Sequence, residues 1–576
     1  MSPQQTSTIR PDPSVAATHV PWWRRGTIYQ VYPRSFADAN GDGTGDVEGI
    51  RSKLPYLSDL GVDGIWISPW YPSPLADGGY DVADYRDINP MFGTLADAER
   101  LLADAHALDI KVIVDLVPNH TSREHRWFRA ALDAGPGSAE RAMYMFRPGR
   151  GTDGELPPNN WTSVFGGPAW TRVDDGEWYL HLFDASQPDL DWTNERVREE
   201  FDAIFRFWLD RGVDGFRVDV AHGMVKDPDL PDLDSDQELL GTNFAVDHPH
   251  WDRDGVHEIN RRWRAVLDEA DRDVMMVAEA WVVPEHLGLY LRPDEYHQSF
   301  NFDFLTADWG HDEAHDAIVR ALDAAQAVGS TPTWTLSNHD VMRHATRYGL
   351  PVGTDWRAWP LAGPADALDA ELGLRRARAM TMLLMALPGS LYIYQGEELG
   401  LPDVWDLPTD VLDDPVWEDS GHTQKGRDGC RVPMAWTPDG SSYGFGSNGA
   451  WLPQPAVYGE LSAAAQSGVA GSTLEMYRAG LDLRARFFET DEDLTWLDLG
   501  PEVLAFRRGS GVVCALNYGA TPAPLPAGGL LLGSEAGLDA IEPETCVWID
   551  PNLRPSLDDR RRQRAMRRPG AHRRMR

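Results

Sequence analysis

The stretch Gly212–His222 contains the first residues whose types and spacing could do chemistry. Its sequence predicts a strand in which Arg217 and Asp219 share one face while Phe216 and Val218 share the other. Burying a cation and a carboxylate on an otherwise apolar strand costs free energy unless the two are paired. Because a nearby guanidinium favours the ionised form of Asp219, this carboxylate is a candidate nucleophile. A purely structural ion pair is the alternative.

Further polar residues follow other predicted strands, namely Asp115, Asn119 and His120, then Glu279, then His339 and Asp340. Carboxylates that converge on one place raise one another's pKa values, so such a set can divide into an ionised nucleophile and a protonated acid. A retaining glycosidase requires that division. The apolar neighbours of Glu279 in the sequence favour it as the acid/base. No His-x-x-x-His metal spacing accompanies these residues.

Apolar segments that alternate with amphipathic ones must position these residues. Eight segments are typical of strands: Gly26–Pro33, Val62–Pro69, Ile110–Val117, Gly212–Val220, Asp273–Trp281, Phe300–Leu305, Pro332–Ser337 and Ser390–Tyr394. Helical spacing recurs between them, as in Ala96–Leu108, Asn194–Asp210, Val256–Ala270 and Leu372–Ala386. This alternation predicts an α/β fold, the (β/α)8 TIM barrel, in which catalytic groups lie at the C-terminal ends of the strands.

Two departures from the alternation predict further domains. About a hundred residues separate the third and fourth strands, far more than a crossover helix needs. After Phe488, short strands with Gly/Pro turns predict a small antiparallel β domain. We therefore expect a disordered lead (1–21), a catalytic barrel (22–117 and 187–490), an inserted subdomain after strand three (118–186), a C-terminal β domain (491–550) and a basic disordered tail (551–576).

Charge and composition exclude several classes of protein. A net charge of −37 argues against nucleic acid as the main partner. No apolar run is long enough to span a membrane, and the polar N-terminus lacks a signal-peptide centre, so we expect a cytoplasmic protein. Three scattered cysteines form neither a disulfide framework nor a zinc site. The tail carries ten arginines and two aspartates; a solvated end is the simplest interpretation, and contact with RNA, an anionic surface or the acidic body is the alternative.

Four segments resemble the ordered motifs of the α-amylase family of glycoside hydrolases, family thirteen. They are Asp115–His120, Gly215–Asp219, Val277–Trp281 and Ser337–Asp340, and they occur in the family's order on the expected strands. The resemblance implies that Asp219 is the nucleophile, Glu279 the acid/base and Asp340 the carboxylate that holds and distorts the sugar. It also implies that the glucose is bound by His120, Arg217 and His339.

Other segments resemble the α-glucosidase and oligo-1,6-glucosidase branch of this family, namely Asp77–Asp81, Asn159–Gly167, Gln187–Asp191 and Arg427–Met434. In such relatives an acid of the first segment pairs with an arginine of the last and grips the terminal glucose. The resemblance assigns these roles to Asp77 and Arg427, with Arg431 equally available. It implies that Tyr80 stacks on the sugar and that Phe165 lines the pocket. A pocket closed in this way implies an exo-acting enzyme.

The resemblance leaves the linkage and the acceptor open. Val220, directly after the nucleophile, favours α-1,6 linkages, whereas Glu279–Trp281 and Val220–His222 resemble α-glucosidases that take maltose. We favour an α-glucosidase acting on short oligosaccharides or glucosides, with an oligo-1,6-glucosidase second. A glucosyltransferase or isomerase using the same intermediate is a third possibility, and a non-catalytic barrel that binds a partner is a fourth. No organic cofactor is implied, and nothing in the sequence indicates an oligomeric state.

The stretch Asp38–Asp46 resembles most of a calcium loop. Oxygen ligands stand at the first, third, fifth, seventh and ninth positions, which are Asp38, Asn40, Asp42, Thr44 and Asp46. Gly49 occupies the position where an EF-hand has a bidentate glutamate, so this is not an EF-hand. It is similar to the metal loop after strand one in oligo-1,6-glucosidases, which implies a structural Ca²⁺ or Mg²⁺. A merely polar turn is the alternative.

Overall fold

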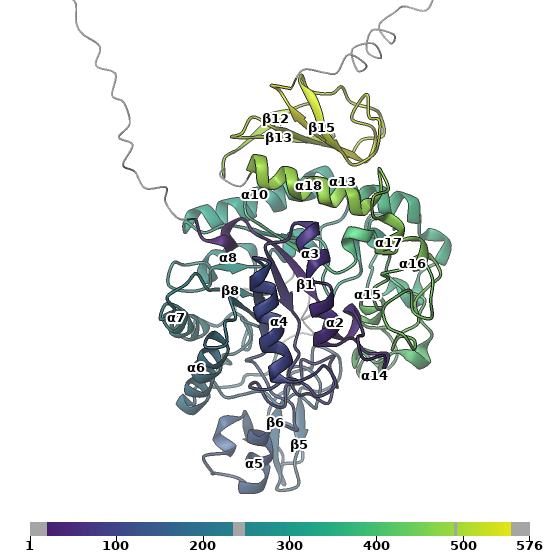
Figure 1. The fold of residues 1–576 in the computed structure, drawn as a ribbon. Coiled ribbons are helices and arrows are strands. Elements are labelled where there is room, and N and C mark those ends of the chain that lie inside the picture. The colour runs from purple at the N-terminus through teal and green to yellow at the C-terminus, as the bar shows by residue number, and fades with distance from the viewer. Residues whose placement is uncertain (1–19, 234–247, 489–491, 554–576) are drawn as a thin grey trace, which may run out of the picture.

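The structure is a computed structural model that describes residues 20–233, 248–488 and 492–553 (Figure 1). Of the predicted lead (1–21), residues 1–19 lie outside the described residues, and of the predicted tail (551–576), residues 554–576 do. Within the described residues no helix is long and apolar enough to cross a membrane.

An eight-stranded parallel sheet forms the centre of the molecule, in the order β10-β11-β1-β2-β3-β7-β8-β9. Its strands are β1 (Thr27–Val31), β2 (Gly64–Ile67), β3 (Lys111–Leu116), β7 (Gly215–Val218), β8 (Met275–Ala278), β9 (Gln298–Ser299), β10 (Thr333–Thr335) and β11 (Ser390–Tyr394). The Thr333 hydroxyl donates to the carbonyl of Ser299 at 2.6 Å, which brings the two edge strands together. The predicted (β/α)8 barrel is confirmed.

Helices surround this sheet (Figure 1). The longer ones are α4 (Leu95–Ala107), α6 (Glu195–Leu209), α7 (Val256–Leu267), α10 (His311–Ala327), α13 (Ala370–Ala386) and α18 (Thr473–Phe488). Side-chain caps explain where several begin: Thr94 and Asp97 form a capping box on α4, and Asn194 and Asp369 cap α6 and α13. The predicted helical segments match these elements within a few residues.

Shorter helices occupy the connections and the first turns after the strands. They are α1 (Pro33–Phe36), α2 (Val47–Ser52), α3 (Leu54–Leu60), α5 (Arg126–Ala134), α8 (Pro284–Tyr290), α9 (Phe302–Leu305), α11 (His344–Arg347), α12 (Trp359–Ala362), α14 (Val416–Asp419), α15 (Asp428–Arg431), α16 (Val457–Glu460) and α17 (Ala463–Gln466). Of these, α12, α14 and α15 belong to segments that shape the cavity described below.

The sixth predicted strand, Phe300–Leu305, is wrong in its position. The strand β9 is Gln298–Ser299, and Phe302–Leu305 is the helix α9. The alternation of aromatic and polar residues in this segment is typical of a strand, but Asn301 caps the helix by accepting the backbone N–H of Phe304 at 3.1 Å. The local cap decides the conformation here, and the propensity of the aromatic residues does not.

The register of the sheet brings the candidate acids to one level. Asp115 of β3 pairs with Arg217 of β7, and Val218 of β7 pairs with Ala278 of β8. The next residues along these neighbouring strands are Asp219 and Glu279. Hydrogen bonds continue the pairing beyond the strands, because the N–H of Glu279 donates to the carbonyl of Val218 at 2.9 Å. The two carboxylates therefore leave the barrel side by side.

Two smaller sheets flank the barrel. Between β3 and α6 lies an antiparallel sheet of β4 (Phe146–Pro148), β5 (Trp170–Arg172) and β6 (Glu177–Leu180). The C-terminal antiparallel sheet has the order β12-β13-β14-β16-β15 and consists of β12 (Leu494–Asp498), β13 (Val503–Arg508), β14 (Val513–Asn517), β15 (Gly529–Gly533) and β16 (Thr545–Asp550). The Trp548 indole of this sheet donates to the carbonyl of Met382 in α13 at 3.1 Å. The two sheets lie at opposite ends of the barrel (Figure 1).

Replacing Phe216 by alanine tests the predicted division of β7 into two faces. Phe216 is fully buried, and its ring centroid lies 4.6 Å from that of Phe205 in α6. Truncation removes this contact and leaves a cavity, so we expect a loss of about 3–5 kcal/mol of folding stability, measured as a lower denaturation midpoint. An unchanged midpoint would contradict the assignment of this face to the core.

Candidate active site

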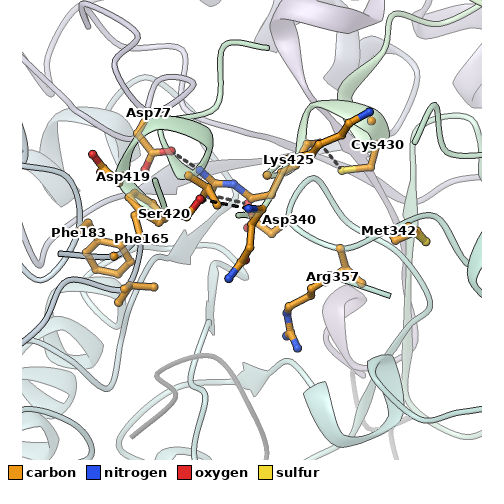
Figure 2. A pocket seen from close by; sticks show the side chains of 18 of the residues that line it. Asp77, Phe165, Phe183, Asp340, Met342, Arg357, Asp419, Ser420, Lys425 and Cys430 are labelled. Atoms are coloured by element: carbon orange, nitrogen blue, oxygen red, sulfur yellow. Dashed lines mark hydrogen bonds and ion pairs between the residues drawn. The ribbon is translucent and has the colours of Figure 1, made fainter. Parts of the chain in front are cut away.

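A large cavity of about 970 Å³ lies at the C-terminal ends of the barrel strands and brings most of the predicted site residues together (Figure 2). Those that line it are Asp77, Tyr80, His120, Phe165, Asp219, Glu279, Asp340 and Arg427. The other two, Arg217 and His339, lie directly behind this wall and are buried. The residues predicted from four strand ends and three distant loops thus form one site.

Arg217 joins the acids of three neighbouring strands. Its guanidinium lies 2.9 Å from a carboxylate oxygen of Asp115, 2.5 Å from one of Asp219 and 3.1 Å from one of Glu279. Only 2% of Arg217 is exposed, so its charge is compensated by these carboxylates and not by water. The predicted pairing of Arg217 with Asp219 is present, and it is one contact within a larger network.

Burial has the largest effect on the ionisation of these acids. It raises the pKa of Asp219 well above its usual value; Arg217 opposes the increase, and the carboxyls of Glu279 and Asp115 add to it. Burial likewise raises the pKa of Asp115 to about 6 against the opposing charge of Arg217. The prediction that Arg217 simply keeps Asp219 ionised is therefore incomplete. Without substrate, we therefore expect the buried carboxyl of Asp219 to hold its proton to a higher pH than an exposed aspartate does.

Glu279 has polar surroundings, unlike those that its sequence neighbours predict. One oxygen, Oε2, accepts the backbone N–H of Val220 at 2.9 Å and lies 3.1 Å from Arg217. The other, Oε1, accepts the indole N–H of Trp281 at 3.1 Å. Val220 has a φ of +45°, which is rare for a β-branched residue, and strain of this kind is typical of functional sites. The apolar residues Val277 and Met275 of β8 instead pack inside the barrel.

An ion pair between two segments that are distant in the sequence closes one end of the cavity. The guanidinium of Arg427 donates to a carboxylate oxygen of Asp77 at 2.6 Å and to Asp414 at 2.6 Å. Arg431 instead donates to the backbone of His339 at 2.8 Å and to Asp340 at 3.0 Å. The structure therefore pairs Asp77 with Arg427 and not with Arg431.

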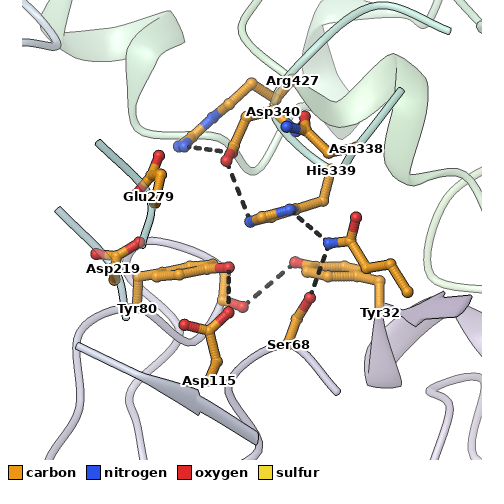
Figure 3. A network of polar contacts seen from close by, with 12 residues as sticks. Tyr32, Ser68, Tyr80, Asp115, Asp219, Glu279, Asn338, His339, Asp340 and Arg427 are labelled. Atoms are coloured by element: carbon orange, nitrogen blue, oxygen red, sulfur yellow. Dashed lines mark hydrogen bonds and ion pairs between the residues drawn. The ribbon is translucent and has the colours of Figure 1, made fainter. Parts of the chain in front are cut away.

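Asp340 lies between these arginines and a buried histidine (Figure 3). Burial would raise the pKa of Asp340, but the permanent positive charges of Arg427 and Arg431 hold it well below its usual value. Burial lowers the pKa of His339 to about 3, so this imidazole is neutral. Its Nδ1 lies 2.7 Å from the amide nitrogen of Gln30, and its Nε2 lies 3.2 Å from Asp340. The amide therefore places the ring proton on Nε2, towards Asp340.

The remaining predicted residues form the walls. The Tyr80 ring stacks on that of His339 with a centroid separation of 5.1 Å, and its hydroxyl donates to Asp115 at 3.1 Å. The Phe165 ring centroid lies 5.0 Å from the Arg427 guanidinium. His120 lies 3.1 Å from the Gln187 amide nitrogen.

Several residues near the cavity received no role from the sequence, among them Gln187, Asp414 and Phe183. The Gln187 side chain donates to Asp77 at 3.0 Å and therefore orients it from the side opposite Arg427. Asp414, fully buried, holds Arg427, and Phe183 lines the cavity beside Phe165 at a ring separation of 5.6 Å. Gln187 lies in a segment that carries the family resemblance, which was the available signal. No sequence signal distinguishes Asp414 from other loop aspartates.

The predicted metal loop folds around its own backbone. Asp38 accepts the N–H groups of Gly41 and Gly43 at 2.6 and 2.9 Å, and Asp46 caps α2 by accepting the N–H of Gly49 at 2.6 Å. Among the described residues no group of three or more His, Cys, Asp or Glu side chains is placed to hold a metal. The carboxylates alone therefore supply only some of the oxygen ligands that Ca²⁺ or Mg²⁺ needs. The side-chain amide oxygen of Asn40 and the carbonyl oxygen of Thr44 would have to complete the coordination shell. The structural ion stays a prediction.

Thermal denaturation with and without Ca²⁺ or Mg²⁺ tests this prediction after treatment with a chelator. If the loop binds the ion only when folded, an ion concentration 100 times Kd stabilises the protein by about 2.7 kcal/mol and raises the midpoint. Asp42→Ala, in an exposed part of the loop, should abolish the response and leave the metal-free midpoint nearly unchanged. A midpoint of the wild-type protein that responds to neither ion would contradict the site.

The fold and the site define a barrel enzyme with paired carboxylates at a pocket closed at one end. A family model described as the catalytic domain of alpha amylase matches residues 30–490. The chain is 38% identical over 520 residues to a probable alpha-glucosidase of Rhizobium meliloti (strain 1021), covering 86% of this chain and 89% of the relative. It is 36% identical over 503 residues to an oligo-1,6-glucosidase of Parageobacillus thermoglucosidasius, covering 80% and 83%.

Among solved structures, the chain resembles that of an alpha-glucosyl transfer enzyme, XgtA, with a TM-score of 0.80 and 36% identity. The match covers 92% of this chain and 100% of that one. The chain therefore belongs to the α-amylase family, as its sequence motifs predict.

Proposed function

We propose that this protein is a retaining, exo-acting α-glucosidase that releases glucose from the non-reducing end of short α-glucosides. The observation that carries the proposal is the placement of Asp219 and Glu279, which leave adjacent strands side by side and line one cavity. A pair of carboxyls on one cavity is what a double displacement needs. The names of the two relatives, an alpha-glucosidase and an oligo-1,6-glucosidase, support the same class of reaction.

The proposed reaction has two steps. In the first, a carboxylate oxygen of Asp219 attacks the anomeric carbon while Glu279 gives its proton to the glycosidic oxygen, which leaves as the alcohol. In the second, Glu279 takes a proton from water, and the hydroxide displaces Asp219 to release glucose in the original anomeric configuration. Asp340, held ionised by its arginines, binds the sugar hydroxyls and favours the distorted ring.

The closed end of the cavity supports exo action. Asp77 and Arg427 meet across it at 2.6 Å. The inserted subdomain closes the same end, because a Cβ atom added to Gly166 would lie 2.6 Å from the carbonyl oxygen of Asp419 in α14. A chain of sugars cannot continue past this contact, so a terminal glucose is the group that fits. The preference for α-1,4 over α-1,6 linkages, and a cytoplasmic location, stay predictions.

Transfer of glucose to a sugar, in place of water, is the second candidate function. The similarity to an alpha-glucosyl transfer enzyme favours it, because hydrolysis and transfer share the covalent intermediate. Incubation with concentrated maltose distinguishes the two: trisaccharide products indicate transfer, and glucose alone indicates hydrolysis.

A substrate panel tests the proposed function. It consists of maltose, isomaltose, sucrose, trehalose and an aryl α-glucoside, with detection of the anomer first released. We expect α-glucose from maltose or isomaltose and from the aryl glucoside. Asp219→Ala removes the nucleophile and should lower kcat by at least about 10⁴-fold with the fold intact, as measured by circular dichroism.

The control is Asp316→Ala, which removes a carboxylate on the exposed side of α10 and should leave kcat unchanged. Release of β-glucose would contradict the retaining mechanism. Substantial turnover by Asp219→Ala would contradict the assignment of the nucleophile.

A further inference from the structure

Trp281 lies two residues beyond the proposed acid/base and touches it. We propose that the indole of Trp281 is a positioning residue that orients the Glu279 carboxyl and fixes which of its oxygens carries the transferred proton. The inference rests on the proposed function and deepens it. None of the roles assigned above to the site residues includes this side chain.

The two oxygens of Glu279 have different partners. Oε2 faces two donors, the backbone N–H of Val220 at 2.9 Å and the Arg217 guanidinium at 3.1 Å. Oε1 accepts the indole N–H of Trp281 at 3.1 Å. A carboxyl oxygen that accepts a backbone N–H and lies beside a guanidinium is a poor place for a proton, since both neighbours stabilise negative charge on it. The geometry therefore assigns the transferable proton to Oε1.

The indole is held firmly enough to impose this orientation. Its ring stacks on that of Phe302 with a centroid separation of 3.9 Å and an angle of 7° between the planes. Trp281 is 7% exposed and packs in the cluster that contains Phe300 and Phe302. The cap on α9 at Asn301 fixes the position of Phe302. The helix α9, in a segment whose sequence predicts a strand, thus supports the indole ring.

The hydrogen bond of Trp281 also changes in strength during the reaction. While Oε1 carries the proton, the indole N–H bonds to a neutral oxygen. When the proton moves to the glycosidic oxygen, Oε1 becomes part of a carboxylate, and hydrogen bonds to ionised acceptors are stronger. An interaction that strengthens towards the transition state accelerates the step. Trp281 therefore orients the Glu279 carboxyl and also favours release of its proton.

A different role for Trp281 would be to shape the cavity that it lines, for the leaving group. The two roles predict different results when Trp281 is substituted, because only the positioning role makes the loss of activity depend on the leaving group of the substrate. A poor leaving group, such as glucose in maltose, needs the proton from Glu279, whereas fluoride leaves as an anion without it. Loss of positioning slows only the first kind of substrate, and loss of shape slows substrates without regard to proton demand.

The test is Trp281→Phe, which retains an aromatic ring against Phe302 and removes the N–H. The quantity compared is kcat/KM, which reports the first step alone, for maltose and for α-glucosyl fluoride. We expect a decrease of about 10–100-fold with maltose and less than about 3-fold with the fluoride. Because the lost N–H stabilises ionised Glu279, the high-pH limb of kcat/KM for maltose should move to higher pH.

The matched control is Trp405→Phe, another tryptophan of the cavity wall, whose ring centroid lies 4.6 Å from that of Trp359. Any decrease in kcat/KM that Trp405→Phe causes should be similar for maltose and for α-glucosyl fluoride. Equal losses on maltose and fluoride in Trp281→Phe, with an unmoved pH limb, would overturn the inference. A wild-type protein that hydrolyses neither substrate would instead reject the proposed function, so the two failures are distinguishable. Thermal denaturation confirms that each variant is folded.

Discussion

The buried guanidinium of Arg217 is the interaction on which the rest of the site depends. Three carboxylates from neighbouring strands, those of Asp115, Asp219 and Glu279, approach it within 3.1 Å. Without this cation they would repel one another in a medium that screens charge poorly, and protonation or displacement would follow. Removing one member of such a group destabilises the fold more than burying the complete group does, because an uncompensated charge remains. The barrel supplies the rigid strands that keep four charged groups this close.

A second group of charges closes the cavity and depends on loops. Arg427 holds Asp77 from the loop after β2 and Asp340 from the loop after β10, and Asp414 holds Arg427. Gln187, at the end of the inserted segment, orients Asp77 from the other side. These contacts join segments that are far apart in the sequence, so the closed end depends on how the loops and the inserted subdomain pack against the barrel. In the proposed function, the chemistry of the reaction thus lies on the strands, and the restriction to chain ends lies on the loops.

The sequence predicts best what short-range patterns encode. The two faces of β7 follow from alternation within a few residues, and the structure places Phe216 and Arg217 accordingly. Prediction is wrong where a local cap overrides alternation, as Asn301 does for α9. The predicted apolar surroundings of Glu279 are also wrong, because its polar partners come from elsewhere in the chain. They are the backbone at Val220 and the guanidinium of Arg217 on the neighbouring strand β7. The partner of Asp77 could not be chosen, since both arginines lie on one short turn.

In the proposed reaction Asp219 forms a covalent bond to glucose during turnover. Mass spectrometry of peptides from enzyme treated with a 5-fluoro-α-glucosyl fluoride, which slows the second step, tests it directly. We expect the peptide containing Asp219 to gain the mass of one fluoroglucosyl group, and we expect the label to disappear when the enzyme is returned to buffer with an acceptor sugar. A label on any other residue would contradict it, as would rapid turnover of maltose by a route that gives inverted glucose.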